Sequence, residues 1–118
     1  MIVKCSFGRV PLTPWDWEVL EAAGNDVMEF VATFGQALFD ASEKGGEPDF
    51  SAVPSELIAR LARFATSTPI PDRPNFPDTL RLADALWELN AMDTLGKFLS
   101  RYQKMVVAAN TRTVSFGI

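Results

Sequence analysis

Residues 25–46, NDVMEFVATFGQALFDASEKGG, are the stretch that decides the fold. Asn25 is a favourable N-terminal cap for a helix. The apolar side chains after it recur with the three- and four-residue spacing of one helical face, at Val27, Phe30, Val31, Phe34 and Leu38. Gly45 and Gly46 end the pattern, because glycine readily adopts the left-handed conformation that closes many helices. The stretch predicts one long amphipathic helix and a protein that is mainly α-helical.

Gly35 lies inside this predicted helix. A glycine at an interior position costs up to ~1 kcal/mol of helix stability relative to alanine, so its presence calls for a reason. We expect the missing side chain to let a neighbouring helix approach closely.

Four more helices follow from the same kind of pattern. We expect them over about residues 14–23, with Thr13 as the cap and Pro14 in the first turn, and over 54–65, 78–90 and 93–109. Asp78 is the expected cap of the fourth helix, and Phe64 is expected on the inner face of the third. The fold predicted is mainly α, with about five helices around one core. Five large side chains are expected to be buried in it: Phe30, Phe34, Leu61, Leu86 and Phe98.

The two ends of the chain have the two-residue alternation of half-buried strands. At the N-terminus the alternation runs over residues 2–7 and stops at Gly8, and at the C-terminus it covers residues 111–118. We expect these short terminal β-strands to pair with each other. No internal repeat or boundary interrupts the pattern, so residues 1–118 are interpreted as a single domain.

Residues 66–79 carry four prolines, Pro69, Pro71, Pro74 and Pro77. Proline at this density disfavours a helix and favours an extended chain. Two interpretations stay open. The segment is a rigid strap that crosses the surface of the domain, or it is a loop that binds a partner.

Composition limits the class of function. The net charge is −4 and the isoelectric point is about 4.7, which argues against a general binder of nucleic acids or membrane surfaces. No apolar run approaches the ~18 residues of a membrane-spanning helix. Cys5 is the only cysteine, so no internal disulfide can form, and we expect a cytoplasmic location.

The sequence offers little for catalysis. It has no histidine, which is the commonest general base and metal ligand in proteins. Cys5 lacks the cationic neighbours that activate a thiolate, and the acidic residues do not follow the spacing of a Ca²⁺ loop. We therefore expect a protein that is not an enzyme and that uses no cofactor and no metal ion.

Other proteins are the expected partners, and aromatic and basic side chains are the candidate contacts. Trp15 and Trp17 are two residues apart, so on one helix they cannot face the same way. Two interpretations stay open: one indole is partly exposed, or both lie in the core because the helix packs in a crevice. Phe76 lies in a predicted loop, and large aromatic side chains are enriched where proteins dock. The three basic candidates are Lys97, Arg101 and Lys104, which would fall on one face of the last predicted helix.

Charge is also divided unevenly along the chain. Residues 1–56 hold three basic and ten acidic side chains, a net charge of −7, and residues 57–118 hold eight and five, a net charge of +3. If the two halves occupied different faces, copies of the chain could attract one another head to tail, giving a homo-oligomer. The other possibility is that the two halves neutralise each other within one monomer, and that the basic face is simply solvated.

One family resemblance accompanies these patterns. A short N-terminal strand followed by residues 10–16, VPLTPWD, opens a compact acidic helical domain, and residues 85–90, ALWELN, have a similar character. In this the chain resembles the small tail-assembly proteins of long-tailed bacteriophages. The resemblance implies an assembly chaperone or small virion component that binds tail subunits or the long ruler protein, in the host cytoplasm or in the virion. An alternative for a compact acidic domain is a small protein inhibitor of a bacterial machine.

Overall fold

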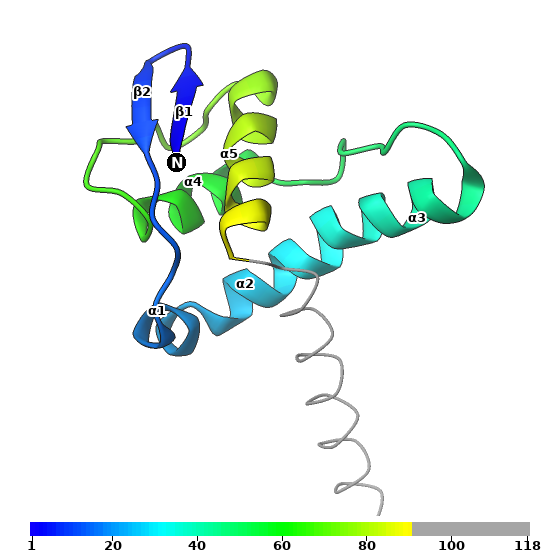
Figure 1. Cartoon of the computed structure of the whole chain (residues 1–118), viewed down its shortest axis with the longest axis horizontal. Coiled ribbons are helices and arrows are strands. Elements are labelled where there is room, and N and C mark those ends of the chain that lie inside the picture. Colours follow the sequence, from blue (N-terminus) through cyan, green and yellow to red (C-terminus); the bar gives the residue numbers. More distant parts are fainter. Residues whose placement is uncertain (91–118) are drawn as a thin grey trace, which may run out of the picture.

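The computed structural model describes residues 1–90 and shows a mainly helical protein with a small antiparallel sheet at its N-terminus (Figure 1). The predicted helix over residues 93–109 and the predicted strand over 111–118 lie outside the described residues. In chain order the elements are β1 (Ile2–Cys5), β2 (Gly8–Pro11), α1 (Trp17–Ala22), α2 (Gly24–Phe30), the π-helical turn η1 (Val31–Gly35), α3 (Gln36–Lys44), α4 (Ser55–Arg63) and α5 (Phe76–Leu89). Since α2, η1 and α3 form one continuous run, residues 1–90 contain four helices.

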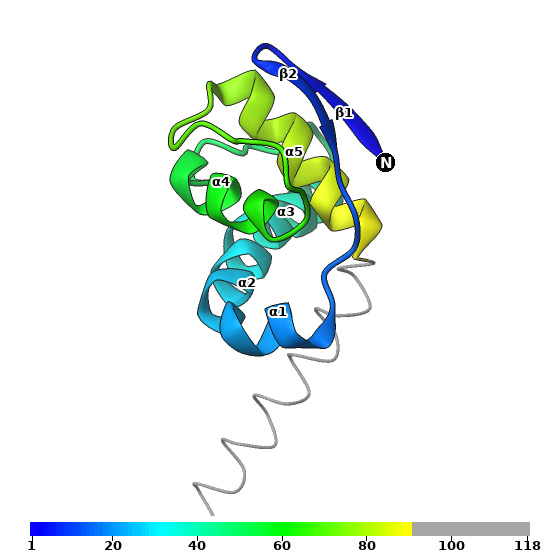
Figure 2. The ribbon, with the colours of Figure 1, turned by 90° about the vertical axis from the view of Figure 1, so that its left-hand side faces the viewer.

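The N-terminal strand pairs with the strand that follows it in the chain. β1 and β2 form an antiparallel hairpin in which Val3 lies opposite Val10 and Cys5 lies opposite Gly8. The prediction of one strand ending at Gly8 was therefore wrong. The turn comes two residues earlier, and Gly8 begins β2 with a φ of 141°, a conformation that favours glycine. The hairpin lies beside α5 in both views (Figures 1 and 2).

Pro11 fits into β2 because of its register. Met1 and Leu12 exchange two backbone hydrogen bonds, of 3.1 and 2.7 Å. Bonded and non-bonded pairs alternate along an antiparallel ladder, so the next pair, Ile2 and Pro11, is a non-bonded one. The N–H that proline lacks is not needed there.

The first helix begins later than predicted, at Trp17, and Asp16 is its cap. The Asp16 carboxylate accepts a hydrogen bond of 2.9 Å from the backbone N–H of Val19. Thr13, the predicted cap, instead donates from both its backbone N–H and its hydroxyl to the carbonyl of Ala65, at 2.8 and 3.2 Å. These bonds hold the chain extended against the end of α4, so Pro14 does not start the helix.

The long helical run over residues 24–44 confirms the central prediction from the sequence. It ends where expected, at Gly45, which has a φ of 67° and donates its N–H to the carbonyl of Ala41 at 2.9 Å. Asn25 is not its cap, because the helix already begins at Gly24, with the single residue Ala23 between it and the end of α1. The outer part of the run, α3, projects from the body of the domain (Figure 1). The predicted close approach at Gly35 is also confirmed, since the Trp87 ring of α5 packs directly against it.

The core lies between α2, α4, α5 and the hairpin. Phe30, Phe34, Leu61 and Leu86 are buried as predicted, whereas Phe98 lies outside the described residues. The prediction for Phe64 was wrong, because α4 ends at Arg63 and the chain turns there. Ala65 takes the buried position, and the Phe64 side chain is 46 % exposed.

The proline segment is shorter than predicted, because α5 begins at Phe76 with Asn75 as its cap. The Asn75 side chain accepts a hydrogen bond of 2.9 Å from the N–H of Asp78, the residue predicted to be the cap. Pro77 lies in the first turn of the helix, where proline is tolerated. Within the segment Ile70 and Pro74 are buried, whereas Pro69 and Pro71 are exposed, so two of its side chains pack on the domain.

Candidate protein-interaction surface

The outward face of α1 carries the most exposed aromatic side chain among the described residues. Because Asp16 caps the helix, Trp17 is its first residue, and Glu21 follows one turn later on the same side. The Trp17 side chain is 63 % exposed, and its indole N–H donates a hydrogen bond of 2.6 Å to Oε1 of Glu21. None of the six residues of α1 is buried. This short helix therefore presents a flat apolar ring to solvent, tied to a carboxylate.

Trp15, the second candidate indole, belongs to the core. It is 7 % exposed, and its indole N–H donates to the carbonyl of Leu61 at 3.1 Å. Its backbone N–H donates to the Asn90 side chain at 2.8 Å, and its ring meets the edge of Phe30. The sequence interpretation of Trp15 as a partner contact was wrong, because the residue precedes the helix and points inward. Of the two interpretations left open by the sequence, the structure shows the one with an exposed indole, that of Trp17.

Phe76, the third aromatic candidate, is 53 % exposed, but it is the first residue of α5 and not part of a loop. In both views the start of α5 and helix α1 lie at opposite ends of the described residues (Figures 1 and 2). The structure thus does not bring Phe76 and Trp17 together. Phe39 on α3 was not among the predicted contacts, yet it is 59 % exposed.

Negative charge surrounds the α1 face. Residues 16–29, which run from the cap of α1 through most of α2, contain five acidic side chains and no lysine or arginine: Asp16, Glu18, Glu21, Asp26 and Glu29. An open depression of about 290 Å³ lies at the joint of α1 and α2, between Glu21 and Asp26. Asp26 is the member of this set that pairs with a described cation, Arg60, at 3.1 Å. The basic candidates Lys97, Arg101 and Lys104 lie outside the described residues.

A second charged surface lies along α4 and carries both signs of charge. Arg63 pairs with Asp72 at 2.6 Å and also donates to the carbonyl of Ile70 at 2.9 Å. Arg73 pairs with Glu56 at 2.7 Å. These exposed pairs contribute only about 0–1 kcal/mol each, but both join the proline segment to α4. They support the strap interpretation of that segment.

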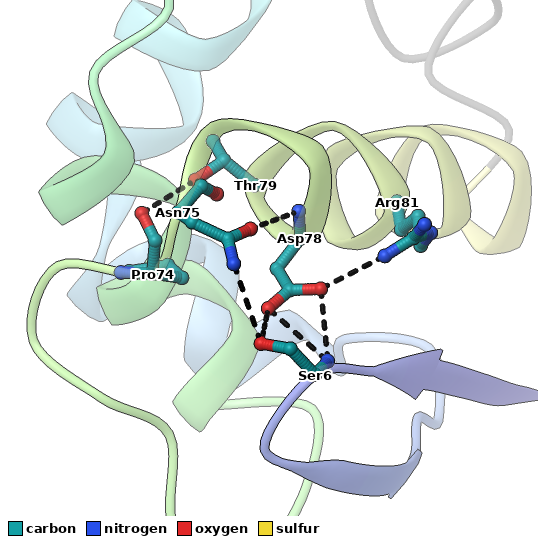
Figure 3. A network of polar contacts seen from close by, with 6 residues as sticks. All are labelled: Ser6, Pro74, Asn75, Asp78, Thr79 and Arg81. Atoms are coloured by element: carbon teal, nitrogen blue, oxygen red, sulfur yellow. Dashed lines mark hydrogen bonds and ion pairs between the residues drawn. The ribbon is translucent and has the colours of Figure 1, made fainter.

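The most polar buried site joins the hairpin turn to the start of α5 (Figure 3). The Asp78 carboxylate is buried and accepts hydrogen bonds from the backbone N–H of Ser6 at 3.0 and 3.2 Å and from the Ser6 hydroxyl. Arg81 adds a bond of 2.9 Å to the same carboxylate. Asn75 completes the group, since its amide nitrogen donates to the Ser6 hydroxyl at 3.3 Å. The four side chains therefore fasten the turn to the helix.

Asp78 and Cys5 both lie near this turn, and neither has a pKa shifted in the direction that activates it. Burial raises the pKa of Asp78, but the bonds from Ser6 and Arg81 outweigh burial, so the pKa lies below its ordinary value and the carboxylate is a weaker base. For Cys5, burial and then the charge of Asp78 raise the pKa, so the thiol stays protonated at neutral pH.

Residues 1–90 hold no candidate metal centre. Within that range no group of three or more cysteine, aspartate or glutamate side chains has the geometry of a metal site. Across the same residues no helix combines the length and the apolar character needed to cross a membrane.

Comparison of the chain with models of protein families, with curated proteins and with solved structures found no match.

Proposed function

We propose that the chain is a protein-interaction domain without catalytic activity, and that a partner protein docks on the outward face of α1. The exposure of Trp17 carries the proposal, since 63 % of this large side chain meets solvent on a helix with no buried residue. Burying an exposed indole in a partner's pocket releases much apolar surface from water, and tryptophan is among the residues most enriched in the energetic centres of protein interfaces.

The chemistry of the chain supports an interaction role over catalysis. The sequence contains no histidine to act as a general base. The lowered pKa of Asp78 and the raised pKa of Cys5 leave neither a strong carboxylate base nor a reactive thiolate at this turn. The interactions of Ser6 and Arg81 with Asp78 are accounted for by the fastening of the hairpin to α5.

The narrower proposal is a role in assembly. The resemblance of residues 10–16 to phage tail-assembly proteins supports a chaperone or small virion component that binds tail subunits in the host cytoplasm. The second candidate is a small protein inhibitor of a bacterial machine, and the acidic run over residues 16–29 favours it as a charge decoy. Neighbouring genes for tail proteins would support assembly, and a neighbouring small helix-turn-helix regulator would support the inhibitor.

The test is affinity capture on the immobilised full chain, using an extract of the cells that produce it. We expect the wild-type chain to retain a partner that the Trp17→Ala variant loses. Phe76→Ala is the matched control, because it removes a comparably exposed aromatic side chain from the distant start of α5. Circular dichroism establishes that both variants are folded. A set of captured proteins that is identical for wild type and Trp17→Ala would contradict the proposal.

A further inference from the structure

The chemistry of the α1 face limits the kind of partner that can dock on it. An inference about that partner rests on the proposed function. Its centre is the exposed Trp17 ring, and the Glu21 carboxylate is held beside that ring by the 2.6 Å hydrogen bond from the indole N–H. A partner group that lies on the indole therefore also lies within reach of a negative charge.

The stretch of chain that carries this centre holds charges of one sign. Between residues 16 and 29 the chain places five carboxylates and no cation, and Asp26 is the member of this set that a described cation, Arg60, neutralises. Glu18 and Glu21 lie on α1 itself. Such a surface repels acidic partners, including nucleic acids and anionic membranes, and attracts basic ones.

We infer that the α1 face binds an arginine-bearing basic segment of a partner protein. A guanidinium group is planar, so it stacks on the indole of Trp17 and at the same time donates hydrogen bonds to the carboxylate of Glu21. A lysine ammonium is a point charge and a strongly hydrated one, and it does not satisfy both groups with the same geometry. The pair of Trp17 and Glu21 thus selects arginine over lysine.

The test measures binding of labelled oligo-arginine and oligo-lysine peptides to the full chain by fluorescence anisotropy at low salt. We expect the Trp17→Ala variant to bind oligo-arginine about two- to five-fold more weakly, as the loss of an exposed cation–π contact predicts. Its affinity for oligo-lysine should change less. Glu21→Gln keeps an acceptor for the indole N–H and removes the charge, so it should also weaken oligo-arginine binding.

The matched controls are Phe76→Ala and Glu88→Gln, which remove an exposed aromatic ring and an exposed carboxylate from α5. Both should bind oligo-arginine like the wild type. Equal affinities of wild type and Trp17→Ala, or equal losses for both peptides, would overturn the inference. The two proposals can fail separately. If oligo-arginine binding depends on Trp17 but no captured protein does, the proposed function is contradicted and the inference is not.

The basic residues of the chain itself provide the competing occupant. Light scattering between low salt and about 0.5 M would detect association of copies through Lys97, Arg101 and Lys104. We expect a monomer at all salt concentrations. A salt-sensitive oligomer that is abolished both by Trp17→Ala and by the Lys97/Arg101/Lys104→Glu triple variant would identify the occupant of the α1 face as a second copy of the chain. That result would overturn the inference that a separate protein binds there.

Discussion

The Trp87 ring lies so close to Gly35 that a Cβ atom built on the glycine would be 2.8 Å from Cη2 of the indole. The contact joins α5 to the π-helical turn in the middle of the long helical run. The ring has little freedom to move away, because it packs at the same time against Phe30 and Phe34, with ring centroids 5.8 and 5.3 Å apart. Gly35 is thus a point at which a side chain of α5 packs tightly against the helical run.

This contact predicts that Gly35→Ala destabilises the protein. Alanine favours a helix by up to ~1 kcal/mol over glycine, whereas forcing a methyl group into a packed contact costs typically ~1–3 kcal/mol. We expect a net loss of about 1 kcal/mol in the free energy of unfolding, measured by denaturant titration. Combining Gly35→Ala with Trp87→Phe should restore some of the loss, because the smaller ring leaves room. If Gly35→Ala stabilised the protein, the close contact would be contradicted.

The helical run shows what the sequence predicts well. Its apolar spacing, Gly45 and the unusual Gly35 are local or repeating features, and each predicted its own structural role correctly. The hairpin was not predicted, because pairing depends on which segments meet in space. Residues 2–7 have the alternation of a strand, but nothing within them shows that Gly8 continues into a partner strand. The cap of α5 was missed for a similar reason, since Ser6, far away in sequence, engages Asp78.

Phe34→Ala should cost on the order of 3–5 kcal/mol, because it leaves a cavity in the aromatic cluster. The Phe34 ring is buried and stacks on Phe50, with centroids 4.8 Å apart. Phe39→Ala is the control in the same helical run, and since Phe39 is exposed the change should stay within about 0.5 kcal/mol. Thermal melting of the two variants measures the difference. Equal shifts would mean that the inner face of the run has been assigned wrongly.

The candidate contacts were only partly predictable. The sequence shows that Trp15 and Trp17 cannot share a direction on one helix, yet it does not show which of them is exposed. That depends on Leu61 and Asn90, which lie far along the chain and hold Trp15 inward. Residue type alone gave no way to separate these two tryptophans, because both a core and an interface favour a large aromatic ring.

Replacing Pro71 or Pro74 by alanine should lower stability only modestly, by ~0.4–1 kcal/mol each, because proline acts mainly by restricting the unfolded chain. The loss should be larger for Pro74, because its ring is buried. Capture of the partner should be unchanged for both variants. If partner binding were lost while the melting temperature stayed the same, the proline segment would be an interface and not a strap.

Removing the charge of Asp78 should loosen the hairpin from α5. Asp78→Asn keeps the size of the side chain but replaces one accepting oxygen by an amide group that donates. The Ser6 N–H and the Ser6 hydroxyl then no longer both have a carboxylate oxygen to donate to. Hydrogen bonds to a charged group contribute ~1.5–3 kcal/mol, so we expect a loss of about 2 kcal/mol at neutral pH. Asp84→Asn is the control, an exposed carboxylate on the same helix. Denaturant unfolding of both variants distinguishes the fastening of the hairpin from a general effect of charge.

The same carboxylate makes stability depend on pH in a defined direction. The bonds from Ser6 and Arg81 hold the pKa of folded Asp78 below its ordinary value of 3.8. The unfolded chain therefore takes up a proton at a higher pH than the folded one, so the contribution of Asp78 is complete well above pH 3.8 and is lost as the pH falls through the folded pKa. We expect the difference in unfolding free energy between wild type and Asp78→Asn to be constant from about pH 5 to 7 and to shrink below about pH 4. Asparagine resembles the protonated acid, so the two proteins should converge there. A difference that stayed constant down to about pH 2.5 would show that the folded carboxylate is not stabilised by its charge.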